Sequence, residues 1–512
     1  MALRVNFNFE AAATHTAIVK NERDMNKSLL RLSTGLRILN AADDSAGLFI
    51  ADQLSIVGSG LEEGNRNIQT GLSALRIAES SAGQIFNRLN EIYKRAVRAA
   101  NDINDPNARS SLQGEINNLI DAIQKIGTDT EYNGIKLLDG TFKNKYIHYG
   151  PRYGQVVEIN IGDVRAQALG AHIVGPAPAS SRVAWGNDTL ANGVDGTDFA
   201  LDENDSLRVA GQVVLSGGTT DVLVDAATAA KNINNDAALQ RMGIEAMAKN
   251  KSVADPFTAV FTTNAANPSA VTVTLEFFVG QKDVSGSPDF SITTRTSTTL
   301  QDLVTQINSQ ASATNTPLTA RAENGRLVLE TTNGETIAIQ ATASGLGTGE
   351  TATINFSQLL QGAQNVNVDD TNSDAYAVRL GELYIYGTES FTVNENGIDI
   401  VGGTASTFNN LYTIDVSSNE GAEKGMLIVK KALQRVDSIR AQIGAVMNNL
   451  QSIYDSQKVA LDNTREAENV IRNTDYAEEM TNFTKLQIKM QSSIAMLAQA
   501  NQLPQLVLQL LR

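Results

Sequence analysis

The sequence predicts an α+β protein of several domains. Helices from both chain ends form coiled-coil or bundle domains, and the middle of the chain forms a β-rich insert. Near both ends, apolar residues recur at alternating steps of three and four, which is typical of helices that pack on other helices. The middle is rich in Thr, Ser, Gly and Asn, and its apolar residues alternate or are β-branched, as in strands. With 512 residues, the chain is long enough for several cored domains.

The first apolar row lies within the N-terminal 40 residues. It consists of Met25, Leu29, Leu32, Leu36 and Leu39. So narrow a row needs a partner helix to cover it, because one helix cannot bury its own seam. Alone, this arm should be only marginally helical.

Two further helices and a glycine-rich connection are predicted next. Asp43 and Asp44 are good N-caps for a helix over 44–57. Gly58, Gly60 and Gly64 predict a loosened connection to a long helix over 65–102. Its apolar row is Ile68, Leu72, Leu75, Glu79, Ala82, Phe86, Leu89, Tyr93, Ala96 and Ala100. Asp105 and Pro106 then start a helix over 106–127.

The C-terminal part repeats the pattern from about residue 420 onward. One row is Val436, Ile439, Ile443, Val446, Leu450 and Ile453, and a last one is Met490, Ile494, Leu497, Asn501, Pro504, Leu508 and Leu511. We expect 65–127 to pack on 424–472 as an ordinary core, and the extreme ends to pack on each other and on neighbouring copies. The residues predicted to make core or inter-subunit contacts are Leu29, Leu32, Leu36, Leu39, Leu72, Leu75, Leu89, Ile439, Ile443, Leu450, Ile494, Leu497, Leu508 and Leu511.

The middle block, residues 176–405, carries all of the net charge. It has 11 Lys and Arg against 26 Asp and Glu, so it accounts for the whole formal charge of −15, and the flanks sum to zero. Neutral flanks suit close packing between copies, whereas an acidic middle suits a solvated outer surface. Within this block, residues 289–341 read as strand, helix, strand and strand, which predicts a small α+β module.

Several function classes are disfavoured. The chain has no Cys and only His15, His148 and His172, so a thiolate or histidine metal site and a Ser-His-Asp triad are not expected. We predict no catalytic, cofactor-binding or metal-binding residue, and therefore no enzyme. No basic stripe indicates nucleic-acid binding. No apolar run of about 18 residues indicates membrane insertion, and no secretory signal peptide is recognisable.

The motifs at both ends resemble bacterial flagellin, the subunit of the flagellar filament. They are Leu30-Arg-Leu-Ser-Thr-Gly-Leu-Arg-Ile38, Ala42-Asp-Asp-Ser-Ala-Gly-Leu48, Tyr132-Asn-Gly-Ile-Lys-Leu-Leu138, the stretch Gln451–Ile471 and the closing Pro504-Gln-Leu-Val-Leu-Gln-Leu-Leu-Arg512. Together they extend the resemblance over about 1–170 and 412–512. The module at 289–341 looks like one that is inserted in flagellar filament, cap and junction proteins.

The resemblance implies an architecture. Residues 1–43 and 474–512 would pair as the inner coiled coil of the filament, residues 44–175 and 406–473 would form an outer-tube domain of helices and a β-hairpin, and residues 176–405 would project outward.

It also implies a function and partners. The chain would be a structural subunit that polymerises head-to-tail and side-by-side into the extracellular flagellar filament for swimming motility. Its partners would be other copies of itself, the flagellar type III export apparatus, a cytoplasmic export chaperone, and the filament cap and hook-junction proteins.

Two alternatives stay open at this point. A hook–filament junction protein shares the chain ends, but the full 30–48 and 132–138 motifs and the large insert favour flagellin. A flagellin whose insert is a metallopeptidase is less favoured, because the three histidines cannot build its zinc site.

The resemblance further implies a segment that faces a vertebrate innate receptor. In flagellins sensed by the flagellin-specific Toll-like receptor, the long N-terminal helix carries a Leu-Gln-Arg-Val-Arg-Glu-Leu-type segment. The matching stretch here is Leu89-Asn-Glu-Ile-Tyr-Lys-Arg95. Glu91 stands where that family has Arg, Lys94 where it has Glu, and Arg95 where it has Leu, so we expect weak activation of the receptor. A shifted alignment would instead place Arg88 at the family's Arg.

Overall fold

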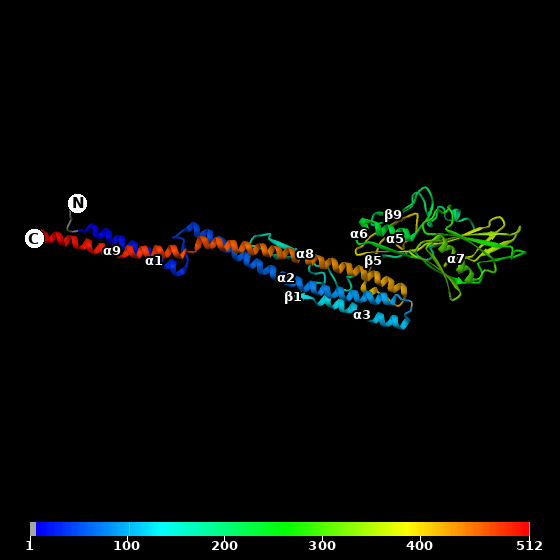
Figure 1. The fold of residues 1–512 in the computed structure, drawn as a ribbon, viewed down its shortest axis with the longest axis horizontal. Coiled ribbons are helices and arrows are strands. Elements are labelled where there is room, and N and C mark those ends of the chain that lie inside the picture. Colours follow the sequence, from blue (N-terminus) through cyan, green and yellow to red (C-terminus); the bar gives the residue numbers. More distant parts are fainter. Residues whose placement is uncertain (1–6, 102, 511–512) are drawn as a thin grey trace.

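The computed structural model describes residues 7–101 and 103–510, and the side chains of this range as far as residue 502. Figure 1 shows an elongated molecule with three parts in a row. A pair of terminal helices lies at one end, a shaft of long helices in the middle, and the β-rich middle block at the other end. The start of the first helix and the end of the last lie together, farthest from the middle block.

The terminal pair consists of α1 (Phe9–Thr34) and α9 (Tyr476–Leu510), which lie antiparallel. Asn8 begins α1, because its Oδ1 accepts a hydrogen bond of 3.1 Å from the backbone N–H of Ala11. Gly35 ends it with a φ of 73°, a left-handed conformation that favours glycine.

Each terminal helix turns one row of buried and half-buried residues toward the other. The row on α1 is Ala11, Thr14, Ile18, Asn21, Met25, Ser28 and Leu32, and the row on α9 is Glu479, Phe483, Leu486, Met490, Ser493, Leu497 and Ala500. Both step by three and four, as in a coiled coil. Polar groups connect them: Asn21 Nδ2 donates to Ser493 Oγ at 3.1 Å, and Ser28 Oγ donates to the carbonyl of Glu479 at 3.5 Å.

The predicted continuation of the N-terminal row is wrong. Leu29 is 52% exposed and does not lie in the seam. Leu36 and Leu39 follow the end of α1, because Gly35 stops the helix. Leu36 instead forms an isolated bridge with Asn473, at the connection between the terminal pair and the shaft.

The shaft consists of α2 (Ser45–Ala99), α3 (Pro106–Asp129) and α8 (Asn419–Arg472). Asp44 is the N-cap of α2 and Asp105 is the N-cap of α3, as the sequence predicts.

The predicted break at Gly58, Gly60 and Gly64 is wrong, because α2 is one uninterrupted helix. The hairpin of β3 (Lys145–His148) and β4 (Val156–Ile159) rests on this part of α2. A Cβ on Gly64 would lie 1.9 Å from the carbonyl oxygen of Tyr149, so glycine is needed here for close packing and not for flexibility.

One apolar core runs along the shaft, and it contains most of the predicted core-facing residues. Its buried helix residues include Ile68, Leu72, Leu75, Ile85, Leu89, Ile92, Leu112, Ile116, Ile120, Ile123, Val436, Ile439, Ile443 and Leu450. A small hairpin of β1 (Glu131–Tyr132) and β2 (Ile135–Lys136) follows α3.

A four-stranded antiparallel sheet connects the shaft to the middle block. In spatial order it contains β11 (Glu245–Lys249), β22 (Glu382–Gly387), β5 (Gly170–Val174) and β24 (Thr407–Asn410). The sheet therefore continues across the boundaries predicted at 175/176 and 405/406. The chain enters and leaves the middle block side by side, since Gly402 N donates to the carbonyl of Gly175 at 2.9 Å.

The middle block contains several further sheets, which are all described within residues 176–405. The largest is β15 (Phe290–Thr294), β14 (Thr272–Val279), β18 (Ile337–Ser344), β21 (Asp374–Arg379) and β6 (Val183–Gly186). The three-stranded sheets are β12 (Lys251–Pro256) with β17 (Arg326–Thr331) and β16 (Leu318–Glu323), β13 (Phe261–Thr263) with β19 (Thr351–Ile354) and β20 (Val366–Asp369), and β23 (Val393–Asn396) with β8 (Ser206–Val209) and β9 (Gln212–Ser216). A pair is formed by β10 (Val222–Leu223) and β7 (Ala200–Leu201).

Four α-helices accompany these strands in the described part of the middle block, although the sequence predicted only one. They are α4 (Leu190–Val194), α5 (Ala226–Asn235), α6 (Ala237–Arg241) and α7 (Leu300–Thr314), and the short 3₁₀ turns are η1 (Phe356–Gln358) and, after β24, η2 (Leu411–Thr413). The predicted helix is α7, and Thr299 and Asp302 cap it reciprocally. Residues 289–341 contain β15, α7, β16, β17 and β18, one strand more than the strand, helix, strand and strand expected, and these strands belong to two sheets that also contain β14 and β12.

The five-stranded sheet separates two apolar cores. Successive residues of a strand point to opposite faces, so Phe277 belongs to one core and Phe278 to the other. We call the part around Phe278, α5 and α6 the near lobe, because it adjoins the shaft. The part around Phe277 and α7 is the far lobe (Figure 1).

Candidate assembly surfaces

The predicted contact residues divide into groups by burial. Those in the shaft core are Leu72, Leu75, Leu89, Ile439, Ile443 and Leu450. Those that are half-buried are Leu32, Leu36, Leu39 and Leu497, and those that are exposed are Leu29 and Ile494. The side chain of Leu508, and all of Leu511, lie outside the described residues.

The terminal pair exposes apolar side chains on its outer faces. Its exposed large apolar residues are Phe9, Val19, Leu29 and Leu30 on α1, and Met480, Ile488, Ile494 and Met496 on α9. Ile488 is 58% exposed and, with Met480 and Thr484, lines a shallow open groove on α9. So many exposed apolar residues on two paired helices are typical of a surface that binds another protein chain.

A second exposed apolar surface lies where the shaft meets the terminal pair. Its residues are Phe49, Ile50 and Ile56 on α2, and Val459 and Val470 on α8. The two helices are adjacent there, because Arg472 Nη1 lies 3.7 Å from Asp52 Oδ1. The apolar rows predicted from the sequence do not include these residues, because they lie outside the seams. Their signal in the sequence is an apolar residue that stands just beside a seam position.

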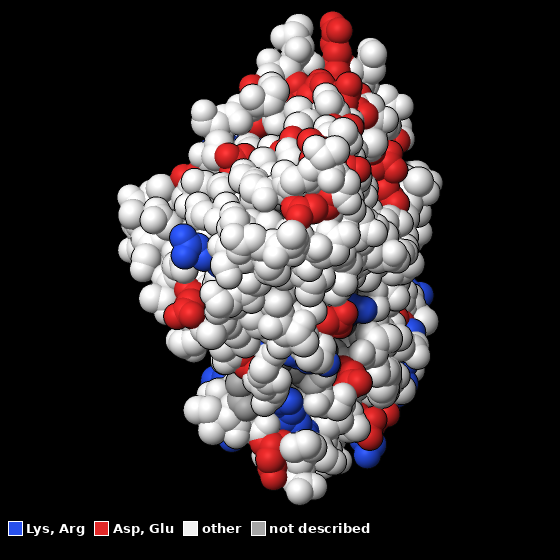
Figure 2. All heavy atoms as spheres, turned by 90° about the vertical axis from the view of Figure 1, so that its right-hand side faces the viewer, with Lys and Arg blue, Asp and Glu red and all other residues white. Residues whose placement is uncertain are grey.

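The middle block presents a different surface. Figure 2 views the molecule from the end of this block, and acidic side chains gather at the top, on the side where β9 lies in Figure 1. Residues 188–221 contain a single cation, Arg208, and the acids Asp188, Asp195, Asp198, Asp202, Glu203, Asp205 and Asp221. Such a surface favours solvation over packing against a copy of itself.

Three of these acids lie close together within the described residues. One carboxylate oxygen from each of Asp195, Asp202 and Asp221 lies within 4.8 Å of the other two. Burial, and then the charges of Asp202 and Asp195, raise the pKa of Asp221. Acidic clusters are common on acidic surfaces without a metal ion, and we assign none to this one.

The segment expected to face an innate receptor lies on α2. Leu89 is fully buried in the shaft core and cannot contact a partner of the folded chain, so its assignment to this surface is wrong. Arg95 Nη1 lies 2.8 Å from Glu91 Oε2, and Arg95 Nε lies 2.6 Å from Glu115 Oε2 on α3. Lys94 also pairs with Glu91, at 3.1 Å. Hydrogen bonds from Arg95, and then from Lys94, lower the pKa of Glu91.

Comparison with known families agrees with the architecture at both ends. The model of the bacterial flagellin N-terminal helical region matches residues 5–143, and that of the C-terminal helical region matches residues 426–511. The flagellin of Aquifex pyrophilus is 50% identical over an alignment of 521 residues that covers 100% of both chains. The chain belongs to the bacterial flagellin family. The flagellin of Aquifex aeolicus is 47% identical, again with 100% of both chains covered.

This flagellin is therefore a structural subunit of a bacterial flagellar filament. The junction-protein alternative has no better support. The flagellar junction protein of Legionella pneumophila is 12% identical with a TM-score of 0.33, over 83% of this chain and 99% of that one, a likeness too low to carry an argument. The family is structural, and no helix in the described part of the chain has the length and hydropathy to cross a bilayer.

Proposed function

We propose that this flagellin polymerises by burying the exposed apolar faces of its terminal pair, and of the adjoining end of its shaft, against neighbouring copies. The observation that supports this most strongly is the set of exposed apolar residues on α1 and α9. These helices already cover each other along one seam, so the outer residues have no further partner within the described chain. Burial of such side chains contributes about 1.5–3 kcal/mol each when it is complete.

We propose the same radial order that the resemblance to flagellin implies. Residues 1–43 and 474–512 would lie innermost, residues 44–175 and 406–473 around them, and residues 176–405 outward. The arrangement of the three parts along one axis supports this order, as does the charge distribution (Figure 1). Neutral parts would then be packed together, and the part with a net charge of −15 would face solvent outside the cell.

Polymerisation is tested with charged residues at two exposed apolar positions of α9. Ile488→Asp with Ile494→Asp should abolish filament growth from seeds, because an unpaired carboxylate in a packed apolar contact costs several kcal/mol. The matched control places two Asp residues on the far lobe, with Ser312→Asp and Thr319→Asp at exposed positions. It should grow filaments like the parent chain. Normal growth of the α9 variant, seen by negative-stain microscopy, would show that these two residues are not part of an assembly surface.

We also propose export through the flagellar apparatus, with residues 1–43 as the signal and a chaperone that covers α9 before assembly. The exposed apolar residues of α9 support a chaperone, because free copies would otherwise associate prematurely. Residues 1–43 fused to a soluble reporter should appear in the medium of flagellated cells, and not in that of cells without the export apparatus. Equal secretion by both strains would contradict the proposal.

A further inference from the structure

Ion pairs attach the start of α8 to the near lobe. Lys431 Nζ lies 2.9 Å from Glu245 Oε1, and Lys430 Nζ lies 2.6 Å from Glu245 Oε2. Glu245 is on β11 of the connecting sheet, so these contacts cross from the shaft to the middle block. Burial alone would raise the pKa of Glu245, but hydrogen bonds from the two lysines outweigh it and lower the pKa to about 2.

Lys431 is the buried member of this group. Its side chain is 0% exposed, whereas that of Lys430 is 46% exposed. Its ammonium also donates to the carbonyl of Gly243 at 2.8 Å, and it lies 5.1 Å from the centroid of the Tyr386 ring. A buried ammonium must keep all of its partners, because any displacement leaves a charge without solvation.

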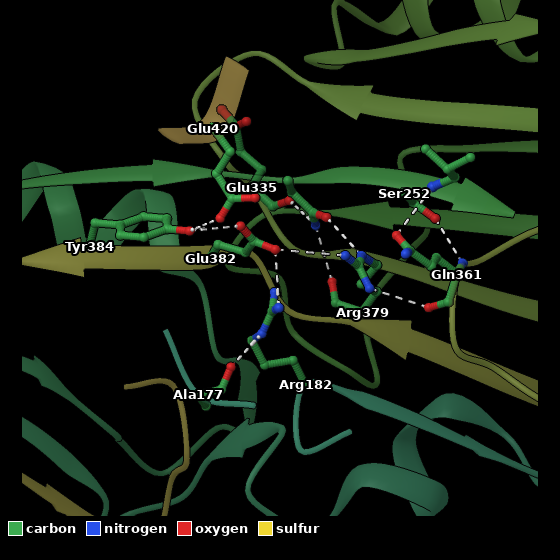
Figure 3. A network of polar contacts seen from close by, with 11 residues as sticks. Ala177, Arg182, Ser252, Glu335, Gln361, Arg379, Glu382, Tyr384 and Glu420 are labelled. Atoms are coloured by element: carbon green, nitrogen blue, oxygen red, sulfur yellow. Dashed lines mark hydrogen bonds and ion pairs between the residues drawn. The ribbon is translucent and has the colours of Figure 1, made fainter. Parts of the chain in front are cut away.

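A second attachment crosses the same interface one strand away. The hydroxyl of Tyr384 lies 3.1 Å from Glu420 Oε1 in the first turn of α8 and 3.3 Å from Glu382 Oε2 on β22 (Figure 3). Lys249 on β11 pairs with Glu423 on α8 at 3.3 Å. The first four turns of α8 therefore contact both β11 and β22 through polar side chains.

Glu382 passes the connection on to two buried arginines. Its Oε1 accepts a hydrogen bond of 3.1 Å from Arg182 and lies 4.0 Å from Arg379 Nη2, as Figure 3 shows. Both arginines are 4% exposed. Burial, and then the charge of Arg182, lower the pKa of Arg379 to about 10, while Glu382 opposes this shift. One carboxylate thus serves two buried cations.

Arg379 extends the network to the far lobe. It donates to the carbonyl of Gln361 and to Asn250 Oδ1, at 3.3 Å each. Asn250 is 2% exposed, and its amide donates to the carbonyl of Glu335 at 2.9 Å. Gln361 N donates to Ser252 Oγ at 2.8 Å (Figure 3). These hydrogen bonds join three segments in one polar cluster. Asn250 lies between β11 and β12, Gln361 lies in the loop after η1, and Glu335 lies just before β18.

We propose that two sets of polar contacts, the buried Lys431–Glu245 pair and the network that runs from Glu420 through Tyr384, Glu382 and Arg379 to Gln361, together lock the shaft and both lobes into a single rigid arm. The middle block then has a fixed direction relative to the shaft in every copy. A block joined only by two adjacent crossing segments would swing about them, which is the ordinary expectation for a domain on a small interface. Here the covalent crossings and the connecting sheet are supplemented by buried charges that would lose their partners if the block moved.

The chain offers a direct measurement, because it contains no cysteine. Spin labels can be attached at Ser438→Cys on α8 and Ser312→Cys on α7, which are both exposed. Pulsed electron paramagnetic resonance on the full-length monomer then gives the distribution of distances between shaft and far lobe. We expect one narrow distribution.

Lys431→Met should broaden that distribution at least twofold in width, because Met retains the apolar stem and removes the buried charge. The matched control is Lys430→Met, which removes the exposed partner of the same carboxylate and should leave the width unchanged. A second label pair, Ser216→Cys with Ser312→Cys, reports on the middle block alone and should stay narrow in Lys431→Met.

Glu382→Gln provides a second variant that keeps the side-chain volume, in case Lys431→Met does not fold. It removes the charge between Arg182 and Arg379 and should also broaden the distribution between shaft and far lobe. A broad distribution in the parent chain would overturn the proposal. So would a folded Lys431→Met or Glu382→Gln chain whose distribution is as narrow as that of the parent.

Discussion

Arg440 on α8 lies against Glu79 on α2, with 2.9 Å between Arg440 Nη2 and Glu79 Oε1. Glu79 occupies the otherwise apolar row of α2, and the Arg440 guanidinium also lies 5.7 Å from the centroid of the Phe86 ring. The side chains of Arg440 and Glu79 are 33% and 39% exposed, so water screens this ion pair.

The shaft should therefore owe its stability to apolar burial and not to this ion pair. We expect Glu79→Ala to lower the free energy of unfolding by about 0.5–1 kcal/mol, the range of a screened pair. Leu89→Ala should lower it by about 2–5 kcal/mol, because Leu89 is fully buried. Urea unfolding followed by far-UV circular dichroism measures both. A larger loss for Glu79→Ala than for Leu89→Ala would contradict this order.

Gly64→Ala should displace the β3–β4 hairpin from α2. The added Cβ would meet the Tyr149 carbonyl, so we expect a loss of about 1–3 kcal/mol, as for other overpacked sites. The freed hairpin should be cleaved faster by trypsin after Lys145 and Arg152. Gly114→Ala on α3 is the control: it meets no atom within 4 Å and should stabilise the chain by up to about 1 kcal/mol. An unchanged cleavage rate in the Gly64 variant would show that the hairpin can shift to make room for the Cβ and still stay packed on α2.

The near lobe should become more stable as the pH falls from about 8 to about 5. Burial raises the pKa of Glu395 to about 7, although the N–H groups of Ile400 and Val401 donate to its Oε1. A carboxyl whose pKa is raised by folding is costly to ionise in the folded state. The resulting loss of stability grows as the pH rises from the ordinary value of 4.5 to about 7, is complete above pH 7 and disappears below 4.5.

We expect this effect to be about 1–3 kcal/mol in the parent chain. Glu395→Gln should nearly remove it, because the amide oxygen can still accept both hydrogen bonds. Thermal unfolding at pH 5, 6, 7 and 8 gives the comparison. An equal pH dependence in parent and variant would assign it to other groups.

Activation of the flagellin-sensing Toll-like receptor should be weak and should be restored by three substitutions on α2. Glu91→Arg, Lys94→Glu and Arg95→Leu recreate the segment of the flagellins that the receptor senses, and we expect at least about a tenfold gain in potency, equivalent to about 1.4 kcal/mol. A reporter-cell assay with purified monomer measures it. Arg88→Ala distinguishes the shifted alignment: if it abolishes an already strong signal, Arg88 is the contact and our alignment is wrong.

The sequence predicts the shaft well because its signal is local and repeated. Ile68, Leu72 and Ile443 are buried as their spacing predicts, and Asp44 and Asp105 cap the helices that follow them. The seam of the terminal pair is harder to predict from the sequence. It contains Asn21, Ser28 and Ser493, which an apolar pattern does not select, although their hydrogen bonds connect α1 and α9.

Other features depend on contacts between distant segments. Gly64 looks like a break until Tyr149 is placed against it. Lys431 looks like a solvated cation until β11 brings Glu245 to it from 186 positions away. Nothing in the sequence near either residue announces its partner, so only the folded chain reveals these roles.

The pairing of α2 with α8 also determines when the chain can fold. Arg440 and Glu79 are 361 positions apart, and the whole middle block lies between them in the sequence. At roughly 5–20 residues per second, a growing chain would complete α2 on the order of tens of seconds before α8 exists to cover it. The far lobe is built from segments that are much closer in the sequence, so it can fold early. The shaft can fold only after its last helix, α8, has been synthesised. Throughout that interval the side of α2 that α8 later covers stays exposed.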